Sequence, residues 1–269
     1  MESCEYCNSF LSFYPTVAVI LNIEADHLDF FKDLEDVEHS FRAFADLVPP
    51  GGTVLANGED ENTMKALEGK EGVLTFGLET GNFHAKNLTW DHGFPTFDLV
   101  WDEKPMAHIT LQVPGEHNVK DAIAAAAASL ILGIPGNAIA QGLKDFRGAG
   151  RRFEFKGKVK GAAVYDDYAH HPGELKALLD TAATLGYDRV ICAFQPPYLH
   201  PHQGPLPGVL SRCSSSRTSR SWQRFLPPGR RTKWASPPRI WPMRFQGPRW
   251  PKTLRNSPTG STTWPSRGT

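Results

Sequence analysis

The apolar residues between Thr16 and Asn22 form an unbroken run of β-branched and aliphatic side chains. Such a run is typical of a strand buried on both faces of a parallel sheet, and we predict one here. Over residues 33–47 the apolar side chains recur at helical spacing instead. The sequence Pro-Pro-Gly-Gly at 49–52 ends this predicted helix before a short strand at 53–56. The alternation of strands and helices predicts a mixed α/β body.

The pattern changes after Gly72, where short alternating segments extend to Val113 and predict antiparallel hairpins at a sheet edge. An alanine-rich helix is predicted at 118–132, with a shorter helix at 137–146. A strand at 152–160 then leads to a linker. From residue 161 the order is strand 162–165, polar turn, helix 174–185 and strand 189–194, which predicts the start of a second α/β domain with a βαβ unit.

The amino-acid composition divides the chain near residue 196. The 269 residues contain 29 basic and 29 acidic side chains. Residues 1–196 hold 16 basic and 29 acidic side chains, whereas residues 197–269 hold 13 basic and no acidic ones, so the net charges are −13 and +13. A carboxylate-free segment rich in Arg, Pro and Ser cannot build an ordinary core. We therefore predict domains at 1–160 and 161–196, and a disordered basic tail at 197–269.

Four cysteines are too few for a disulfide framework in a chain of this size. Cys4-x-x-Cys7 suggests zinc or redox chemistry, but no second pair or neighbouring His completes a site in the sequence, so we expect two ordinary side chains beside a buried strand. No run approaches the roughly 18 apolar residues of a membrane span, and residues 1–5 lack the features of a signal peptide. We expect a cytoplasmic protein without a membrane partner.

Two polar clusters lie where ligands commonly bind in α/β proteins. Residues 22–29 follow the first predicted strand, and Asp26, His27 and Asp29 are candidates for a metal or a phosphate-bound Mg²⁺; the alternative is a solvated helix start. Residues 115–121 begin a helix, whose free N–H groups and dipole favour an anionic or hydrogen-bonding ligand. The alternative for this cluster is helix capping by Asn118.

A third cluster combines residues 146–154 with residues 164–172. The paired arginines of the first segment suit bidentate recognition of phosphate, although a surface arginine pair is often only solvated. The second segment contains Asp-Asp-Tyr-Ala-His-His-Pro at 166–172, which concentrates titratable groups after a strand and offers little to a core.

In this order and spacing, the motifs resemble those of the Mur ligase family. The resemblance runs from Glu2-Ser-Cys-Glu-Tyr6 to Ile191-Cys-Ala-Phe-Gln-Pro196, and covers essentially the whole body. It implies most of a central ATPase domain and the start of a Rossmann-like C-terminal domain. The His-His pair at 170–171 points to the alanine-adding branch or to its relative that recycles murein tripeptide.

The implied reaction belongs to peptidoglycan synthesis: ATP converts the carboxylate of UDP-N-acetylmuramate to an acyl phosphate, which the amine of L-alanine attacks. Mg²⁺ and basic side chains would neutralise the transferred phosphate. Asp121 replaces the Asn usual in the family, so one nucleotide contact differs. The resemblance implies the following roles: Glu5 and His27 as Mg²⁺ ligands, Asn118 and Asp167 as nucleotide contacts, Arg152 as a phosphate contact, and Tyr168 and His170 facing the muramoyl or alanine site.

The chain also departs from the family pattern. A UDP-binding domain and a GTxGKT phosphate-binding loop usually come first, but the chain contains no Gly-Lys-Thr or Gly-Lys-Ser. We therefore expect Met1 to lie inside the central domain, and we expect no catalysis by this chain alone.

We propose that a change of reading frame explains the tail. In the family, Pro196 is typically followed by His-Thr-Tyr-Thr-Arg-Thr-Lys-Ala-Leu-Phe, and this peptide results when one base is skipped in an allowed back-translation of residues 197–207. A second slip is expected between about Gly208 and Ser221. The alternative takes the Arg, Lys and Trp residues of the tail as a surface for single-stranded nucleic acid; we expect no specific nucleic-acid partner.

Overall fold

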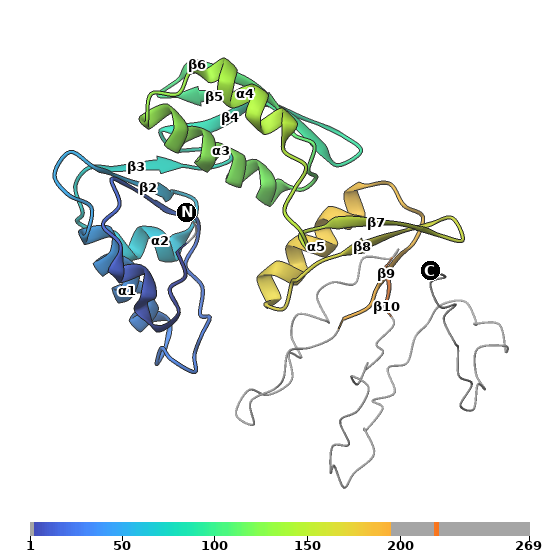
Figure 1. Cartoon of the computed structure of the whole chain (residues 1–269), viewed down its shortest axis with the longest axis horizontal. Coiled ribbons are helices and arrows are strands. Elements are labelled where there is room, and N and C mark those ends of the chain that lie inside the picture. Colours follow the sequence, from blue (N-terminus) through green and yellow to red (C-terminus); the bar gives the residue numbers. More distant parts are fainter. Residues whose placement is uncertain (1–2, 195–217, 221–269) are drawn as a thin grey trace, which may run out of the picture. The chain divides into compact units, whose positions relative to one another are not determined.

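The computed structural model describes residues 3–194 and 218–220. The chain divides into two units, Met1–Arg224 and Phe225–Thr269, and the second lies outside the described residues. The first unit contains one six-stranded sheet with helices on it, followed by a hairpin, a helix and two short strands (Figure 1).

The six-stranded sheet has its strands in chain order. β1, β2 and β3 are parallel, and β3 meets β4 in parallel at a single residue pair, Phe76 and Phe83. β4, β5 and β6 are joined by antiparallel pairing. The predicted antiparallel hairpins are therefore confirmed for β4 to β6, whereas the prediction is wrong for β3, which lies after Gly72 but is parallel to both of its neighbours. The bounds are β1 (Val17–Ile20), β2 (Thr53–Asn57), β3 (Val73–Phe76), β4 (Phe83–Asp91), β5 (Phe94–Trp101) and β6 (Lys104–Thr110).

Helices cover both faces of this sheet, as the alternation of side chains along β2 shows. Val54 and Ala56 belong to a core cluster with residues of α1 (Leu34–Asp46) and α2 (Glu61–Ala66). Leu55 points the other way and belongs to a cluster with α3 (Glu116–Ile131) and α4 (Gly136–Asp145). Since successive side chains of a strand point to opposite faces, the body has three layers. The helices predicted at 33–47, 118–132 and 137–146 correspond to α1, α3 and α4.

One prediction about β1 is wrong. The strand forms where expected, but it is the outermost strand of the sheet within the described residues, and its burial alternates. Ala18 and Ile20 are each 1% exposed, whereas Val19 is 36% exposed and Leu21, just beyond the strand, is 44% exposed. An apolar run alone cannot distinguish a central strand from an outer one, because it contains no information on how many neighbours the strand has.

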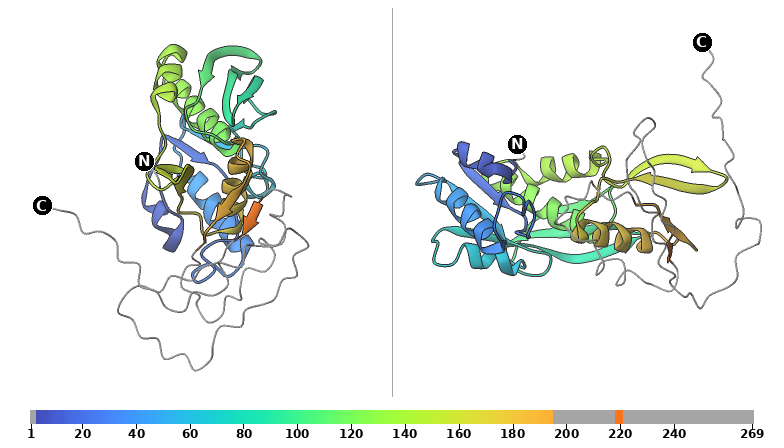
Figure 2. Two further views of the ribbon diagram at one scale, coloured as in Figure 1. Left: turned by 90° about the vertical axis from the view of Figure 1, so that its right-hand side faces the viewer. Right: turned by 90° about the horizontal axis from the view of Figure 1, so that it is seen from below.

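The C-terminal part begins with a hairpin of β7 (Glu154–Val159) and β8 (Ala162–Asp166), visible as a twisted two-stranded ribbon in Figures 1 and 2. The predicted strands are present, but β8 pairs with β7 and not with β9 (Val190–Cys192), so the expected βαβ pairing is wrong within the described residues. α5 (Pro172–Thr184) connects β8 and β9. The predicted domain boundary at 160/161 coincides with the turn of the hairpin, and the division of the chain into domains stays a prediction.

The predicted disordered tail lies almost entirely outside the described residues. Its described part is β10 (Thr218–Arg220), which pairs in parallel with β9. Within the described residues, no helix is long and apolar enough to cross a membrane.

Candidate nucleotide and metal site

The first turn of α3 closely approaches α5. Gly115, which precedes α3, has a φ of +102°, and a Cβ atom here would lie 2.4 Å from Oγ1 of Thr181 on α5. Only glycine tolerates both the left-handed backbone and this contact. Asn118 does not cap the helix: its Nδ2 donates to the carbonyl oxygen of Pro114 at 2.7 Å, and the N-terminus of α3 has no side-chain cap. The capping alternative for Asn118 is therefore wrong, and the helix presents its first N–H groups without a side-chain acceptor.

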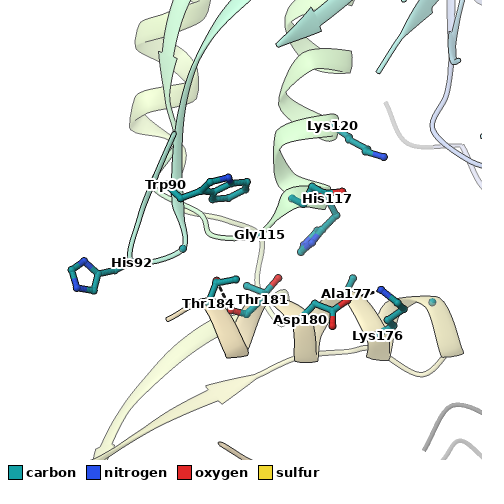
Figure 3. A pocket seen from close by; sticks show the side chains of 13 residues that line it. Trp90, His92, Gly115, His117, Lys120, Lys176, Ala177, Asp180, Thr181 and Thr184 are labelled. Carbon is teal, nitrogen blue, oxygen red and sulfur yellow. Dashed lines mark hydrogen bonds and ion pairs between the residues drawn. The ribbon is translucent and has the colours of Figure 1, made fainter. Parts of the chain in front are cut away.

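A cavity of about 670 Å³ opens beside this helix end. Its walls come from the first turn of α3, from α5 and from the turn between β4 and β5. Figure 3 shows the ring of His117 pointing toward α5 and the indole of Trp90 pointing toward α3, whereas the ring of His92 points away from them. The cavity thus combines an aromatic wall, a helix N-terminus and polar side chains, as small-molecule sites commonly do. Its lining includes Trp90, Gly93, Gly115, His117, Lys120, Lys176, Asp180 and Thr181.

His117 and Asp121 form an electrostatic cluster with Arg152 and Asp167. The side chains of His117 and Asp121, both on α3, reach solvent, but the protein around them reduces their hydration. This desolvation lowers the pKa of His117, against the opposing effect of the carboxylates of Asp121 and Asp167. Desolvation also raises the pKa of Asp121, while His117 and Arg152 act in the opposite direction. The helix start is therefore electrostatically coupled to the two motifs that follow α4.

Hydrogen bonds join the two segments of the third sequence cluster, residues 146–154 and residues 164–172. The carboxylate of Asp167 accepts the backbone N–H of Phe153 at 2.7 Å and that of Ala169 at 2.7 Å. Arg152 Nη1 lies 3.0 Å from Oε1 of Glu174. Asp167 thus has a structural task in joining residues 151–154 to the turn after β8, and its remaining lone pairs stay available to a ligand.

Tyr168 and His170 lie together in the turn between β8 and α5. Tyr168 is 52% exposed, and the guanidinium of Arg151 lies 4.7 Å from the centre of its ring. The rings of Tyr168 and His170 are 5.2 Å apart in an edge-on arrangement, and the backbone N–H of His170 donates to Glu174 at 2.9 Å. Both predicted substrate contacts are therefore accessible to solvent, and Tyr168 lies beside Arg151.

An ion pair connects this turn to the loop after β1. His171 Nδ1 lies 2.9 Å from Oε2 of Glu24. The hydrogen bond between them raises the pKa of His171 and lowers the pKa of Glu24, in each case against the effect of burial. The Glu24 carboxylate also lies close to Gly173, where a Cβ atom would come within 3.1 Å of both its oxygens. The loop at residues 22–29 and the turn at residues 166–172 therefore meet directly, although Glu24 and His171 are 147 residues apart in the sequence.

The two predicted metal ligands also lie together. Glu5 Oε1 is 3.6 Å from His27 Nε2, and both side chains are about 30% exposed. Asp26 and Asp29 do not join them: Asp26 accepts the N–H of His27 at 2.7 Å, and Asp29 accepts the hydroxyl of Tyr6 at 3.1 Å. The first cluster therefore contributes one of its three candidate ligands.

Glu5 and His27 fit a cation that keeps part of its hydration. Mg²⁺ commonly takes one or two protein groups and fills its other positions with water and substrate phosphates. Glu5 supplies the oxygen that Mg²⁺ prefers, and the partial exposure of both side chains leaves room for the other ligands.

Sequence reasoning missed several residues of this region. Glu24, His171 and Glu174 lie within or beside quoted motifs, but their ion pairs depend on loops that only the fold brings together. Nothing in the sequence indicated that Trp90 or the residues of α5 line a cavity. The expectation for Cys4 and Cys7 is also wrong, since both are exposed in and beside η1 (Tyr6–Ser12) and do not pack beside a buried strand.

The chain matches known proteins over most of its described length. The sequence profile of the Mur ligase middle domain matches residues 3–129, and that of the Mur ligase glutamate ligase domain matches residues 151–211. UDP-N-acetylmuramate–L-alanine ligases of Clostridium novyi (strain NT) and Clostridium acetobutylicum are 48% and 44% identical to it over 196 and 197 residues. Each alignment covers 72% of this chain and 43% of the relative, so the chain spans less than half the length of these relatives.

A solved structure agrees with these sequences. UDP-N-acetylmuramate-alanine ligase MurC from Thermotoga maritima superposes with a TM-score of 0.60 at 29% identity, over 70% of this chain and 43% of that one. Two domain profiles of one family together match 188 residues, and the sequence relatives and the solved structure belong to the same family. The chain belongs to the Mur ligase family.

Proposed function

We propose that residues 3–194 supply the adenine-nucleotide and metal-binding part of a ligase that joins L-alanine to UDP-N-acetylmuramate. The observation that carries this proposal is the convergence of distant motifs: the α3 start, Arg152 and Asp167 form one electrostatic cluster, and Glu24 pairs with His171. Mur ligases are ATP-dependent, and the relatives at 44–48% identity are named for alanine.

Each residue of the proposed site has a role that matches its chemical groups. Asn118 and the first N–H groups of α3 suit the polar edges of a nucleotide, and Arg152, whose charge acts on His117 and Asp121, suits a phosphate. Bound Mg²⁺ would neutralise charge on the transferred phosphoryl group, with Glu5 and His27 as its protein ligands. Tyr168 and His170 lie on the exposed side of the turn, where an acyl acceptor can approach. These roles extend the family assignment to individual side chains.

The substrates also imply a location. ATP and a nucleotide-linked sugar are intracellular metabolites, and we propose that the protein acts in the cytoplasm. The chain contains no Gly-Lys-Thr or Gly-Lys-Ser phosphate-binding sequence, so we expect nucleotide binding without turnover by this chain alone.

A chimera tests the proposal. Residues 3–194 replace the matching segment of the Clostridium novyi ligase, and product formation from ATP, UDP-N-acetylmuramate and L-alanine is followed by mass spectrometry. We expect alanine to be ligated, and Asp167→Ala to abolish turnover. Murein tripeptide in place of alanine tests the recycling alternative. A folded chimera that binds ADP but forms no alanine product would contradict the proposal.

A further inference from the structure

The segment at residues 4–7 carries two thiols to which the proposed function gives no role. Cys4 and Cys7 are both exposed, and neither is part of a disulfide. A thiol must be accessible to exchange with a disulfide in solution, because its sulfur has to reach a sulfur of that disulfide. Two cysteines separated by two residues are also the arrangement that disulfide oxidoreductases use for a reversible disulfide. The segment is therefore a candidate for redox chemistry.

The backbone brings the two cysteines close together. Glu5 has the helical dihedral angles φ −73° and ψ −22°, and Tyr6, the first residue of η1, is also helical. Two successive residues in this conformation turn the chain as a type I β-turn does, and the Cα atoms that flank such a turn lie less than about 7 Å apart. Disulfides join Cα atoms that are about 4.4–6.8 Å apart. The turn thus places Cys4 and Cys7 within reach of one disulfide.

Hydrogen bonds hold this turn in place. The backbone N–H of Asn8 donates to the carbonyl oxygen of Glu5 at 2.8 Å, and the N–H of Phe10 donates to the carbonyl oxygen of Cys4 at 3.2 Å. Cys7 and Asn8 have φ angles of +55° and +57°, a region that residues other than glycine seldom occupy unless their surroundings impose it. Because the fold already fixes the segment, closing a disulfide here costs less conformational entropy than it does in an unfolded chain.

The two thiols also approach the same pair of rings. The sulfur of Cys4 lies within 4.8 Å of a ring nitrogen of His27. Asp29 raises the pKa of the Tyr6 hydroxyl, and the thiol of Cys7 adds to this rise through its charge and a hydrogen bond. The rings of Tyr6 and His27 are 4.9 Å apart. The side chains of Cys4 and Cys7 therefore both extend toward the Tyr6–His27 pair, as two cysteines that form a disulfide must extend toward a common point.

We propose that Cys4 and Cys7 are a redox-active pair that exchanges with small-molecule disulfides. The thiolate of one cysteine attacks a sulfur of the small disulfide, which forms a mixed disulfide and releases one thiol. The second cysteine then attacks the protein sulfur of the mixed disulfide and releases the other thiol. Two electrons and two protons thus pass from the protein to the released thiols. The closed ring contains Glu5 and Tyr6, so oxidation restrains the segment that carries a proposed metal ligand. The pair itself does not depend on the ligase activity.

Equilibration of the full-length chain with reduced and oxidised glutathione tests the pair. After acid quenching, alkylation and tryptic digestion, mass spectrometry counts the free thiols of the peptide 1–32, which ends at the first basic residue and contains Cys4, Cys7 and no other cysteine. We expect this peptide to lose both alkylation sites together and to become lighter by two hydrogen atoms. Cys4→Ser should instead leave Cys7 as a mixed disulfide with glutathione. Cys192→Ser is the matched control and should retain the disulfide, because Cys192 lies in β9.

The same titration in guanidinium chloride separates the contribution of the fold from that of the sequence spacing. We expect the disulfide to be at least about tenfold more stable in the folded chain, which equals about 30 mV in reduction potential, because the turn is already formed there. The proposal is overturned if the peptide 1–32 keeps both thiols in excess oxidised glutathione, if it carries two glutathione adducts, or if unfolding leaves the stability of the disulfide unchanged.

Discussion

At the scale of single residues, the ion pair of His171 and Glu24 has a defined pH range. Because the pKa of His171 is raised, the stability that its charged form contributes to the fold is fully present below the ordinary histidine pKa of about 6.5, and is lost as pH rises through the raised pKa. Because the pKa of Glu24 is lowered, the stability that its carboxylate contributes is present above about pH 4.5, and is lost as pH falls through the lowered pKa. The contact between the two loops should therefore be strongest between about pH 4.5 and 6.5.

Replacement of the carboxylate tests this pair directly. Glu24→Gln removes the negative charge and keeps a similar shape, so we expect the pKa of His171 to fall in an NMR titration of its ring signals. Asp180→Asn is the matched control, since Asp180 lies on α5 and pairs with Lys176 instead. An unchanged pKa of His171 in Glu24→Gln would show that the ion pair does not form in solution.

Which residues approach one another was only partly predictable. Glu5 and His27 lie 3.6 Å apart, as expected of two ligands of one metal, but resemblance to a family and not spacing suggested the pair. The contact between Glu24 and His171 was likewise unpredictable, since each residue is polar and belongs to a turn that could equally be solvated.

At the scale of elements, the start of α4 depends on a glycine. A Cβ atom on Gly136 would lie 2.1 Å from the carbonyl oxygen of Met106 in β6. The backbone of β6 cannot move aside as a flexible side chain can. We therefore expect Gly136→Ala to displace α4 from β6. We expect a loss of about 1–3 kcal/mol in the free energy of unfolding, measured by urea denaturation.

A second glycine of the same helix provides the matched control. Gly142 lies inside α4, and a Cβ atom there would meet nothing within 4 Å. Gly142→Ala should stabilise the protein by up to about 1 kcal/mol, because alanine has the higher helix propensity. Destabilisation by both substitutions, or by neither, would contradict the packing of α4 on β6.

The positions of helices and strands were easier to predict from the sequence than the pairing of the strands. The helical spacing at 33–47 and the alanine-rich run after Asn118 gave α1 and α3 within about two residues, since apolar periodicity is a local property. The outer position of β1 and the pairing of β8 with β7 were not foreseen. Both features depend on contacts between strands. The spacing of apolar residues within one strand does not determine which strand pairs with it.

At the scale of the whole molecule, the zero net charge is the sum of −13 in residues 1–196 and +13 in residues 197–269. We propose that the basic segment is translated out of frame; apart from β10 it lies outside the described residues. The share of the chain covered by the relatives, 72%, equals about 194 residues and is consistent with a change near residue 196. The profile of the second domain extends further, to residue 211.

The coding sequence tests the frame proposal without any protein. Skipping one base near the codon of Pro197, with a second shift between about Gly208 and Ser221, should restore a peptide that continues the alignment with alanine-adding ligases. If no pair of shifts in these intervals extends the alignment, the tail is a genuine translation product, and its basic composition needs another explanation.

The central claim is that the start of α3 and the turn after β8 form an adenine-nucleotide site. Isothermal titration of the full-length chain with Mg²⁺ and ADP tests it most directly. The account predicts saturable binding of one ADP, weakened about 5- to 100-fold by Asn118→Ala through the loss of a polar contact. His108→Ala, on β6 and not among the residues that line the cavity, should bind as the parent does. Absence of saturable binding, or equal affinity of Asn118→Ala and the parent chain, would contradict the account.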